Sequence, residues 1–395
     1  MTERRRVVGA EQIDRASRRG RKFIEILPGS IVTDQARDAA ARLGIELRLG
    51  PLDRPAAPQG DGGAALYRGL YRRHPKWMPA FPAKGRNATR FRKLTLIGAG
   101  GVGAALAQLV FNRQLTEQLT LIDLVPGLAE SLAMDMKHAS GTSRQSGRVD
   151  GGTDVGMAEG SSAVVVTAGR SRSPGMDRSE LATANGRIVR SLAEAIQSTA
   201  PESVIIMVSN PLDEMTAVML TATRFPRERV IGMAGTLDSA RFRVALADTA
   251  AVPVSEVDAM VIGSHGAEMV PLLSLARIRG QPLHRFLSEQ AIADCVAATI
   301  AAGGRIVELR RTASASIAPA HAVLDLLEHM SGRIAGAVPA TIALDGEFGL
   351  SDTVIGVPCR LGTRGLIEVD EVPLSESERD QLHQAAAAVR SRTNQ

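Results

Sequence analysis

The stretch around residue 100 contains residues whose types and spacing suit the binding of a dinucleotide. Gly98 allows a tight turn, Gly100 lets backbone N–H groups approach a pyrophosphate, and Gly103 lets the next helix pack close to the preceding strand. The N-terminus of that helix would direct partial positive charge toward the phosphates. Asp123, roughly 20 residues further on, would accept hydrogen bonds from the ribose hydroxyls. Because Leu124 rather than a cation follows Asp123, the pattern favours NAD over NADP. A glycine triplet alone would also fit a flexible turn.

The elements around this loop support the dinucleotide interpretation. Apolar runs at 94–97 and 119–122 flank an Ala/Leu-rich helical pattern, which predicts strand, turn, helix and strand. Strands and helices then continue to alternate, which predicts a Rossmann-type, doubly wound parallel sheet. The expected elements are a strand at 163–167, a helix at 178–198, a strand at 203–208, a helix at 213–220 and a strand at 230–232.

The pattern changes beyond residue 237. Helices there mix with alternating segments at 352–358 and 365–369, which predicts a second, α+β domain. Ser375 and Glu378 have the spacing of a capping box that opens a C-terminal helix. We therefore expect an α/β protein with a NAD-binding Rossmann domain at 93–236 and a catalytic, substrate-binding domain at 237–395.

The first 92 residues differ from the rest in charge. They hold about 20 Lys and Arg against about 9 Asp and Glu, whereas the remainder is mildly acidic. Residues 1–49 are expected to form a small helix/strand appendage, with a helix at 34–43 that Thr33 opens and Gly44 closes. Residues 50–92 combine a Pro/Gly-rich linker with a basic amphipathic arm.

The basic arm has three open interpretations. Within residues 64–82, apolar side chains recur at helical spacing at Leu66, Tyr67, Leu70 and Tyr71. This helix could be a targeting peptide, could dock on its own body or on another subunit, or could bind nucleic acid or a membrane, the least favoured option. Residues 31–47 are similar to a short module of proteins encoded with bacterial microcompartments. That resemblance implies a microcompartment shell or other assembly partner for residues 64–82.

The bulk composition narrows the class of protein. No apolar run reaches the ~18 residues that a membrane span needs, and no apolar core follows the N-terminal arginines, as a secretory signal would require. Cys295 and Cys359 cannot form a disulfide framework, and no cluster has metal-ligand spacing. We expect two buried thiols, no metal site and a cytoplasmic location, inside a microcompartment if the arm is a targeting device.

Five segments beyond residue 93 occur in the order, and at about the spacing, of the lactate/malate dehydrogenase family. Residues 93–392 resemble that family, and the segment GEFGLSDTVIGVP at 346–358 is most similar to its bacterial, lactate-dehydrogenase-like malate dehydrogenase branch. The five segments are the glycine loop at 98–103, RSPGMDR at 172–178, SNP at 209–211, TLDSARF at 236–242 and SHGAEMVP at 264–271.

The resemblance implies a proton relay at His265. Histidine has an ordinary pKa that suits passing a proton in both directions near neutrality. Asp238 would orient the imidazole ring and stabilise the imidazolium. Arg241 lies one helical turn after Asp238 and would form a bidentate pair with the C1 carboxylate of the substrate. A surface ion pair is the plainer alternative for Asp238 and Arg241.

Two arginines bracket the segment that resembles the mobile loop of the family. Arg178 would polarise the substrate carbonyl, and Arg172 would bind the distal carboxylate of oxaloacetate or malate. Lactate-specific relatives usually have an uncharged residue at the position of Arg172, because a buried arginine without a carboxylate partner is costly. The small-molecule substrate is therefore expected to be a dicarboxylate. Neighbouring Arg170 is interpreted as a solvated cation.

Four further residues are expected near the cofactor. Thr167 and Gly169 would line its trough, and Asn185 is a weaker candidate there. Asn210 would hydrogen-bond the substrate oxygen or the nicotinamide amide.

The resemblance implies a reversible NAD-dependent malate dehydrogenase of the tricarboxylic acid cycle, assembled as a homo-oligomer, a dimer or a tetramer. Two alternatives stay open: a dehydrogenase of lactate or another 2-hydroxy acid, with Arg172 turned to solvent, and an assembly or encapsulation module with secondary enzyme activity. Ser173 and Ala267 depart from the family pattern, which usually has lysine and aspartate there. Substrate identity is therefore less certain than reaction type.

Overall fold

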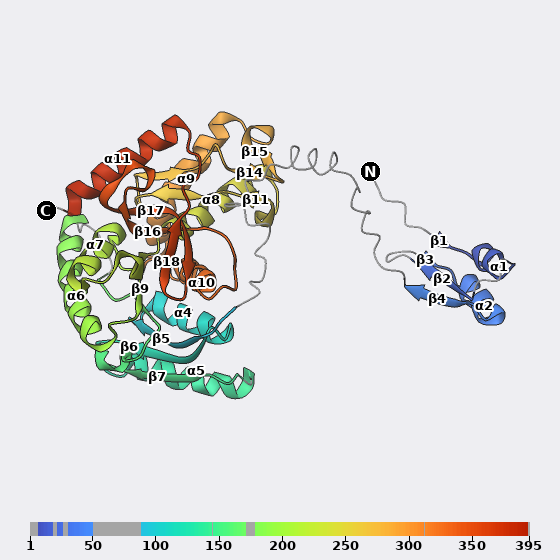
Figure 1. Cartoon of the computed structure of the whole chain (residues 1–395), viewed down its shortest axis with the longest axis horizontal. Helices are drawn as coiled ribbons and strands as arrows, with labels where there is room; N and C mark the ends of the chain where they lie inside the picture. The colour runs from blue at the N-terminus through green and yellow to red at the C-terminus, as the bar shows by residue number, and fades with distance from the viewer. Residues whose placement is uncertain are drawn as a thin grey trace. The chain divides into compact units, whose positions relative to one another are not determined.

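A computed structural model of the chain describes residues 7–18, 22–26, 31–49, 88–143, 145–170, 178–311 and 313–393 (Figure 1). The chain divides into two compact units, one within residues 1–73 and the other within residues 74–395. The predicted linker and amphipathic arm lie outside the described residues, and so do Arg172 and Ser173.

The described residues of the N-terminal unit form two helices and two short parallel strand pairs, β1 with β3 and β2 with β4. The predicted helix at 34–43 is confirmed: Thr33 accepts a hydrogen bond from the Ala36 N–H at 3.2 Å, and Gly44 adopts a left-handed conformation with φ 63°. The elements are β1 (Val7–Val8), α1 (Ala10–Arg18), β2 (Phe23–Ile26), β3 (Ile31–Val32), α2 (Asp34–Leu43) and β4 (Glu46–Leu49).

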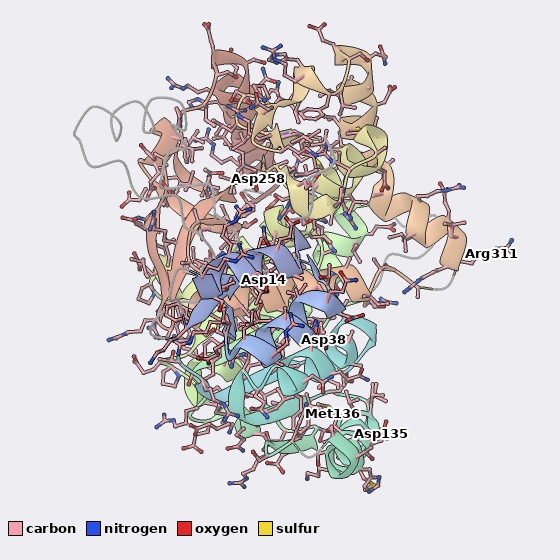
Figure 2. All side chains as sticks on the ribbon, turned by 90° about the vertical axis from the view of Figure 1, so that its right-hand side faces the viewer. Asp14, Asp38, Asp135, Met136, Asp258 and Arg311 are labelled. Atoms are coloured by element: carbon pink, nitrogen blue, oxygen red, sulfur yellow. The ribbon has the colours of Figure 1, made fainter. Side chains whose placement is uncertain are left out.

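This unit has a small apolar core of its own. Ile13 of α1 and Ala36 of α2 are fully buried, and Ile45 packs with them. Asp38 lies on the exposed side of α2, and Asp14 lies next to buried Ile13 on α1 (Figure 2). The alternation of apolar and charged positions thus folds both helices onto one shared interior.

One sheet organises the larger unit. Its first half is parallel in the order β7-β6-β5-β8-β9-β10, the doubly wound arrangement that the alternating pattern predicts. The strands are β5 (Phe91–Ile97), β6 (Thr116–Ile122), β7 (Arg148–Gly152), β8 (Ala163–Val166), β9 (Val204–Met207) and β10 (Val230–Gly232).

The second half of the sheet is antiparallel. Strand β16 pairs with β10, and the order continues through β17 and β12 to β13, with β18 paired to β17. These strands are β12 (Val261–Gly263), β13 (Met269–Pro271), β16 (Val338–Asp345), β17 (Ser351–Gly362) and β18 (Gly365–Val369), and a separate sheet joins β11 (Val257–Asp258), β14 (Arg277–Ile278) and β15 (Gln281–Pro282). The predicted strands at 352–358 and 365–369 are confirmed.

Helices cover both faces of this sheet (Figure 1). No helix in the described ranges is long and apolar enough to span a membrane. The helices are α4 (Gly101–Asn112), α5 (Leu128–Ser143), α6 (Arg178–Thr199), α7 (Leu212–Thr223), α8 (Gly235–Ala250), α9 (Glu289–Arg310), α10 (Ile317–Met330) and α11 (Glu376–Thr393), with short 3-10 turns at Val155–Ala158, Arg227–Arg229, Val254–Glu256, Leu283–Arg285 and Glu347–Gly349.

The central strands are buried on both faces, which explains their continuous apolar sequences. In β8, Val165 packs into the core beneath α4 and α10, whereas Val164 and Val166 pack into the opposite core beneath α6 and α7. The outer helices are amphipathic in the same sense: on α5, Met136 is buried and the preceding Asp135 is exposed (Figure 2).

The predicted capping box opens α11. The Ser375 N–H donates to Glu378 at 2.9 Å, and the Glu378 N–H donates to the Ser375 hydroxyl at 3.3 Å. Both cysteines, Cys295 and Cys359, are buried, as expected. The boundary predicted between 236 and 237 falls in the first turn of α8.

Candidate functional site

The register of the parallel strands brings the predicted cofactor residues to one edge of the sheet. Ile97 at the end of β5 pairs with Ile122 on one side and with Val166 on the other. The next residue along each chain segment is Gly98, Asp123 or Thr167. Ligands of doubly wound sheets bind beyond the carboxyl ends of the strands, so these three segments lie where a dinucleotide is expected.

Two of the three loop glycines are required by close contacts. A Cβ at Gly98 would lie 2.4 Å from the Thr167 hydroxyl oxygen, and Gly98 has φ +108°. A Cβ at Gly103 would lie 1.8 Å from the carbonyl oxygen of Gly98, so α4 packs directly against the end of β5. At Gly100, by contrast, a Cβ would meet nothing within 4 Å. Gly100 therefore faces open space at the N-terminus of α4, and its predicted contact with a pyrophosphate stays a prediction.

Asp123 is joined to the glycine loop. One carboxylate oxygen accepts the Ala99 N–H at 2.7 Å, and the other accepts the Val125 N–H at 2.9 Å. These bonds fix the carboxylate at the end of β6. Each carboxylate oxygen can accept a second hydrogen bond, so the predicted contact with ribose hydroxyls stays chemically available.

Three of the four other cofactor candidates lie next to the loop or to one another. The Thr167 hydroxyl donates to the Gly98 carbonyl at 3.1 Å, and a Cβ at Gly169 would lie 3.3 Å from the Asn185 side chain. Asn185 is buried, and its side-chain amide forms hydrogen bonds with the backbone of Arg170. The same amide donates to the Asn210 carbonyl at 2.6 Å. Asn185 therefore braces the segments that carry Gly169 and Asn210, and its predicted contact with the cofactor stays a prediction.

His265 and Asp238 meet as the sequence predicts. His265 lies in the hairpin loop between β12 and β13, and its Nδ1 is 2.8 Å from Oδ2 of Asp238 on α8. Arg241 donates from Nη1 to the other oxygen of Asp238 at 3.3 Å. The Asp238 side chain is 2% exposed, whereas those of His265 and Arg241 are 22% and 15% exposed. A buried carboxylate thus holds two cationic groups that both reach the surface of the site.

The surroundings of His265 favour its protonated form. Burial by itself disfavours the imidazolium, but the charge and the hydrogen bond of Asp238 outweigh burial, and the pKa of His265 is raised above 6.5. Asp213 adds to this rise, and Arg241 opposes it. The histidine is therefore suited to hold a proton near neutrality.

Two contacts hold α8 against the strand that carries the histidine loop. A Cβ at Gly235 would lie 2.8 Å from the carbonyl oxygen of Val261, so only glycine permits this approach of α8 to β12. The Ser239 hydroxyl accepts the Val261 N–H at 2.8 Å. Since Asp238 directly precedes Ser239, these contacts set its distance from His265.

The remaining predicted residues are placed less completely. Arg178 begins α6, and its side chain is outside the described residues, as is the whole of Arg172. Asn210 follows β9 with an exposed side chain. No contact of these three side chains with the His265 site can be described, and their roles stay predictions.

The sequence did not single out the buried carboxylate of Asp213 or the two buried hydroxyl groups that it binds, those of Ser264 and Thr341. Asp213, fully buried on α7, accepts hydrogen bonds from the Ser264 hydroxyl at 2.7 Å, the His265 N–H at 3.0 Å and the Thr341 hydroxyl at 3.3 Å. Burial raises the pKa of Asp213, and the bonds from Ser264 and His265 oppose that rise. The only available signal was the position of Asp213 two residues after the SNP segment.

The glycine loop, the parallel sheet and the His265–Asp238 pair together define an NAD-dependent oxidoreductase. The sequence matches the profile of the lactate/malate dehydrogenase NAD binding domain over residues 92–232 and that of the alpha/beta C-terminal domain of the same family over residues 235–395. The chain belongs to the lactate/malate dehydrogenase family.

Individual relatives agree with this assignment. A malate dehydrogenase of Nostoc punctiforme is 40% identical over 303 residues, which are 77% of this chain and 92% of that protein. The structure of the malate dehydrogenase from Aeropyrum pernix matches with a TM-score of 0.74 and 36% identity over 76% of this chain and 97% of that one. A lactate dehydrogenase from Cryptosporidium parvum, complexed with lactic acid and β-nicotinamide adenine dinucleotide, matches with a TM-score of 0.74 and 31% identity over 78% and 98%.

Proposed function

We propose that this chain is a malate dehydrogenase that interconverts malate and oxaloacetate with NAD, the reaction of the tricarboxylic acid cycle. The contact of His265 with buried Asp238, with Arg241 beside it, is the observation that carries the proposal. The relatives named malate dehydrogenase support the choice of substrate.

The proton chemistry follows from the orientation of His265. Because Nδ1 faces Asp238, Nε2 is the nitrogen that exchanges a proton with the substrate. In the oxidation direction Nε2 accepts the hydroxyl proton of malate, and Asp238 stabilises the imidazolium that forms. In the reduction direction Nε2 returns the proton to the oxygen of oxaloacetate. NAD, when bound, supplies the nicotinamide ring that exchanges a hydride with the substrate carbon.

Arginines hold the dicarboxylate in this proposal. Arg241 binds the C1 carboxylate through its guanidinium, Arg178 polarises the carbonyl, and Arg172 binds the distal carboxylate. Asp238 shares a helix face with Arg241, so one carboxylate orients the proton donor and the substrate clamp together.

The deciding experiment is the steady-state oxidation of NADH with oxaloacetate and, separately, with pyruvate. A large preference in kcat/KM for oxaloacetate is expected. A preference for pyruvate would instead support lactate dehydrogenase, the name of the similar Cryptosporidium parvum enzyme. Activity with neither acid would leave other 2-oxo acids as substrates and would reject both assignments.

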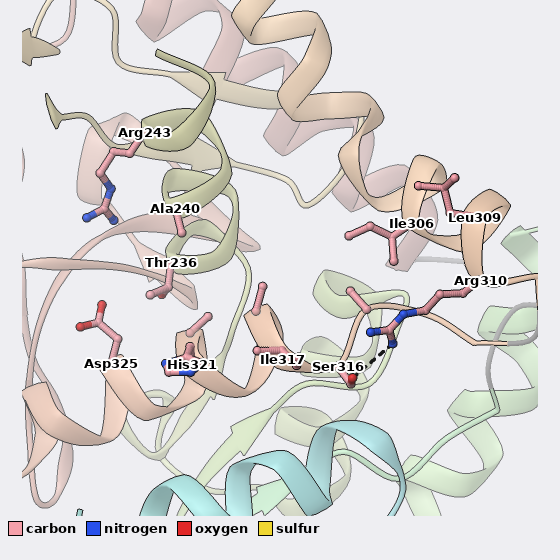
Figure 3. Close-up of a pocket in the computed structure, with 13 residues that line it drawn as sticks. Thr236, Ala240, Arg243, Ile306, Leu309, Arg310, Ser316, Ile317, His321 and Asp325 are labelled. Carbon is pink, nitrogen blue, oxygen red and sulfur yellow. Dashed lines mark hydrogen bonds between the residues drawn. The ribbon is translucent and has the colours of Figure 1, made fainter. Parts of the chain in front are cut away.

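We also propose that the enzyme is a homo-oligomer. A cavity of about 780 Å³ opens between α8, α9 and α10, with Ile306 of α9 and Ile317 of α10 on facing sides (Figure 3). Leu309 and Ile317 are 69% and 63% exposed, and such an apolar rim is typical of a subunit interface. Light scattering tests both points. A wild-type mass of a single chain would contradict the homo-oligomer. A smaller mass for Ile317→Asp than for wild type would support this interface, and an unchanged mass would contradict the interface.

The first 92 residues are proposed to act in assembly or targeting rather than in the reaction, in the cytoplasm or within a bacterial microcompartment. Both family profiles begin at residue 92 or later, and the N-terminal unit has its own core. Deletion of residues 1–87 should leave kcat/KM nearly unchanged. A loss of oligomer on deletion would favour docking within the enzyme, and a loss of turnover would contradict the proposal.

A further inference from the structure

We propose that Arg392, near the end of α11, is a positioning residue that braces the loop carrying His265. The proposal rests on the proposed function, in which His265 transfers the proton. Helix α11 packs against α7, β12, β13 and β17, and its C-terminal end lies beside α7 (Figure 1). A residue in the last turn of the chain thus lies beside a site whose other residues come from much earlier in the sequence.

The guanidinium of Arg392 donates from all three nitrogens. Nε donates to Glu214 of α7 at 2.8 Å, Nη1 donates to Glu268 at 3.0 Å, and Nη2 donates to the Ser264 hydroxyl at 3.2 Å. Ser264 and Glu268 stand on either side of His265 in the hairpin loop. One rigid, planar group therefore holds both ends of the loop and ties them to α7.

The hydrogen bonds form a chain with a fixed direction. Arginine can only donate, so the Ser264 oxygen accepts from Arg392, and the single Ser264 hydrogen is free to go to Asp213 at 2.7 Å. The same oxygen of Asp213 accepts the backbone N–H of His265 at 3.0 Å. Arg392 thereby orients the hydroxyl whose partner anchors the His265 backbone.

Charge makes the brace hard to replace. The carboxylates of Glu214 and Glu268 meet at the Arg392 guanidinium, and the Glu214 side chain is only 7% exposed. A second oxygen of Glu268 is buried and has no hydrogen-bond partner among the described residues. Without the cation, the nearly buried Glu214 carboxylate would face the partly exposed Glu268 carboxylate, and the loop would move to separate them.

A shift of the loop would act on the reaction through the His265–Asp238 contact. Among the described residues, the charged groups that act on the pKa of His265 are Asp238 and Arg241 of α8 and Asp213 of α7. If the loop moves, Nδ1 leaves its 2.8 Å contact with Asp238, and the imidazolium loses its main stabilising partner. The expected results are a lower kcat and a pH profile that moves toward lower pH, with little change in NADH affinity.

Replacement of Arg392 by glutamine tests the proposal on the full chain. In Arg392→Gln, kcat for oxaloacetate reduction should fall about tenfold or more, because a misplacement of catalytic groups by about 1 Å can cost about 10²-fold in rate. The high-pH limb of the kcat profile should move to lower pH in this variant, and the Kd for NADH should stay within about twofold of wild type. Arg392→Lys, which keeps the charge but not the fork, should restore part of the rate.

Arg390→Gln is the matched control. Arg390 lies on the same helix and donates to the Ser351 carbonyl at 3.3 Å, away from the histidine loop. The Arg390→Gln enzyme should keep the kcat and pH profile of the wild type. If Arg392→Gln does not fold, Glu268→Gln provides the second test, because it removes the loop's charged contact with Arg392 and should shift kcat and pH in the same direction.

A wild-type kcat and pH profile in Arg392→Gln would overturn the proposal, even with a lower melting temperature. The proposal would also be overturned if Arg392→Gln and Glu268→Gln lowered only the melting temperature and left kcat and the pH profile unchanged. Failure of the proposed function would look different: the wild type itself would not reduce oxaloacetate, or His265→Gln would retain activity.

Discussion

Nδ1 of His265 lies 2.8 Å from Oδ2 of Asp238, although the two residues are 27 positions apart in the chain. Asp238 is nearly inaccessible to solvent, so this bond forms where screening by water is weak. It fixes the ring orientation, leaves Nε2 for the proposed proton transfer and raises the pKa of the histidine.

Replacement of Asp238 by asparagine should change the pH dependence of the enzyme. In the proposed mechanism reduction uses protonated His265, so the rate of oxaloacetate reduction should fall as pH rises through a His265 pKa that lies above 6.5. Without the charge of Asp238 this pKa drops, and the falling limb moves to lower pH. In Asp238→Asn we also expect kcat to fall by about 10² to 10⁴, the usual contribution of positioned acid–base catalysis.

The measurement is kcat/KM for oxaloacetate between pH 5 and 10. Asp248→Asn is the control, because Asp248 lies exposed on the same helix and should leave the profile unchanged. An Asp238→Asn enzyme with the limb in its original place would show that another group sets it.

Two glycines of the cofactor loop should respond differently to alanine. A Cβ at Gly103 would collide with the Gly98 carbonyl, so Gly103→Ala should lower the melting temperature by several degrees, as about 1–3 kcal/mol of overpacking does. Gly100 has an ordinary φ of −70° and open space above it, so Gly100→Ala should fold normally. If the pyrophosphate occupies that space, Gly100→Ala will bind NADH more weakly.

Thermal unfolding and NADH titration by fluorescence distinguish the two effects. The expectation is a lower melting temperature for the Gly103 variant and an unshifted one with a higher Kd for the Gly100 variant. Normal NADH affinity in Gly100→Ala would place the pyrophosphate elsewhere.

The order of elements was predictable because each has a local cause. The central strands β8 and β9 are continuous apolar runs, Thr33 and Gly44 terminate their helix, and Ser375 with Glu378 cap α11. The single sheet was not predictable in this way. Its two halves join through one pairing, Gly232 with Thr341, and no local pattern specifies a partner that far along the chain.

In the site, too, residues within recognisable sequence segments could be predicted, whereas residues placed by distant packing could not. Asp238 and His265 lie in recognisable segments, so their contact could be expected. Asp213 and Arg392 could not be singled out, because a buried carboxylate looks like a surface one in sequence and Arg392 reaches the site only through the packing of α11. Arg172 and Arg178 keep their predicted roles as expectations.

An ion pair away from the site should contribute to stability in a pH-dependent way. Arg227 makes two bonds to Glu347, at 2.8 and 3.1 Å. Burial opposes ionisation of Glu347, but the bonds from Arg227 outweigh it and lower the pKa of Glu347 from 4.5 to about 2. This contribution is fully present above pH 4.5 and is lost as pH falls toward 2.

Glu347→Gln should therefore reduce the free energy of unfolding at pH 7 by about 2 kcal/mol, an order-of-magnitude figure from the pKa shift. The deficit relative to wild type should shrink between pH 4.5 and 2 in urea titrations. Glu228→Gln removes a more exposed partner of Arg227 and should cost little. A Glu347→Gln deficit that is constant with pH would mean that packing, not charge, is responsible.

The substrate assignment depends on Arg172, and its replacement by glutamine tests that role most directly. If Arg172 binds the distal carboxylate, kcat/KM for oxaloacetate should fall by about 10²-fold or more, since a charged hydrogen bond contributes about 3 kcal/mol or more in a closed site. Activity on pyruvate, which has no distal carboxylate, should fall little or rise, because a buried arginine without a partner disfavours it. Arg170→Gln is the control, since Arg170 is an exposed cation just before the loop. Equal losses on both acids in Arg172→Gln would remove Arg172 from the specificity site, while an Arg170→Gln enzyme with the switched preference would move the role to Arg170.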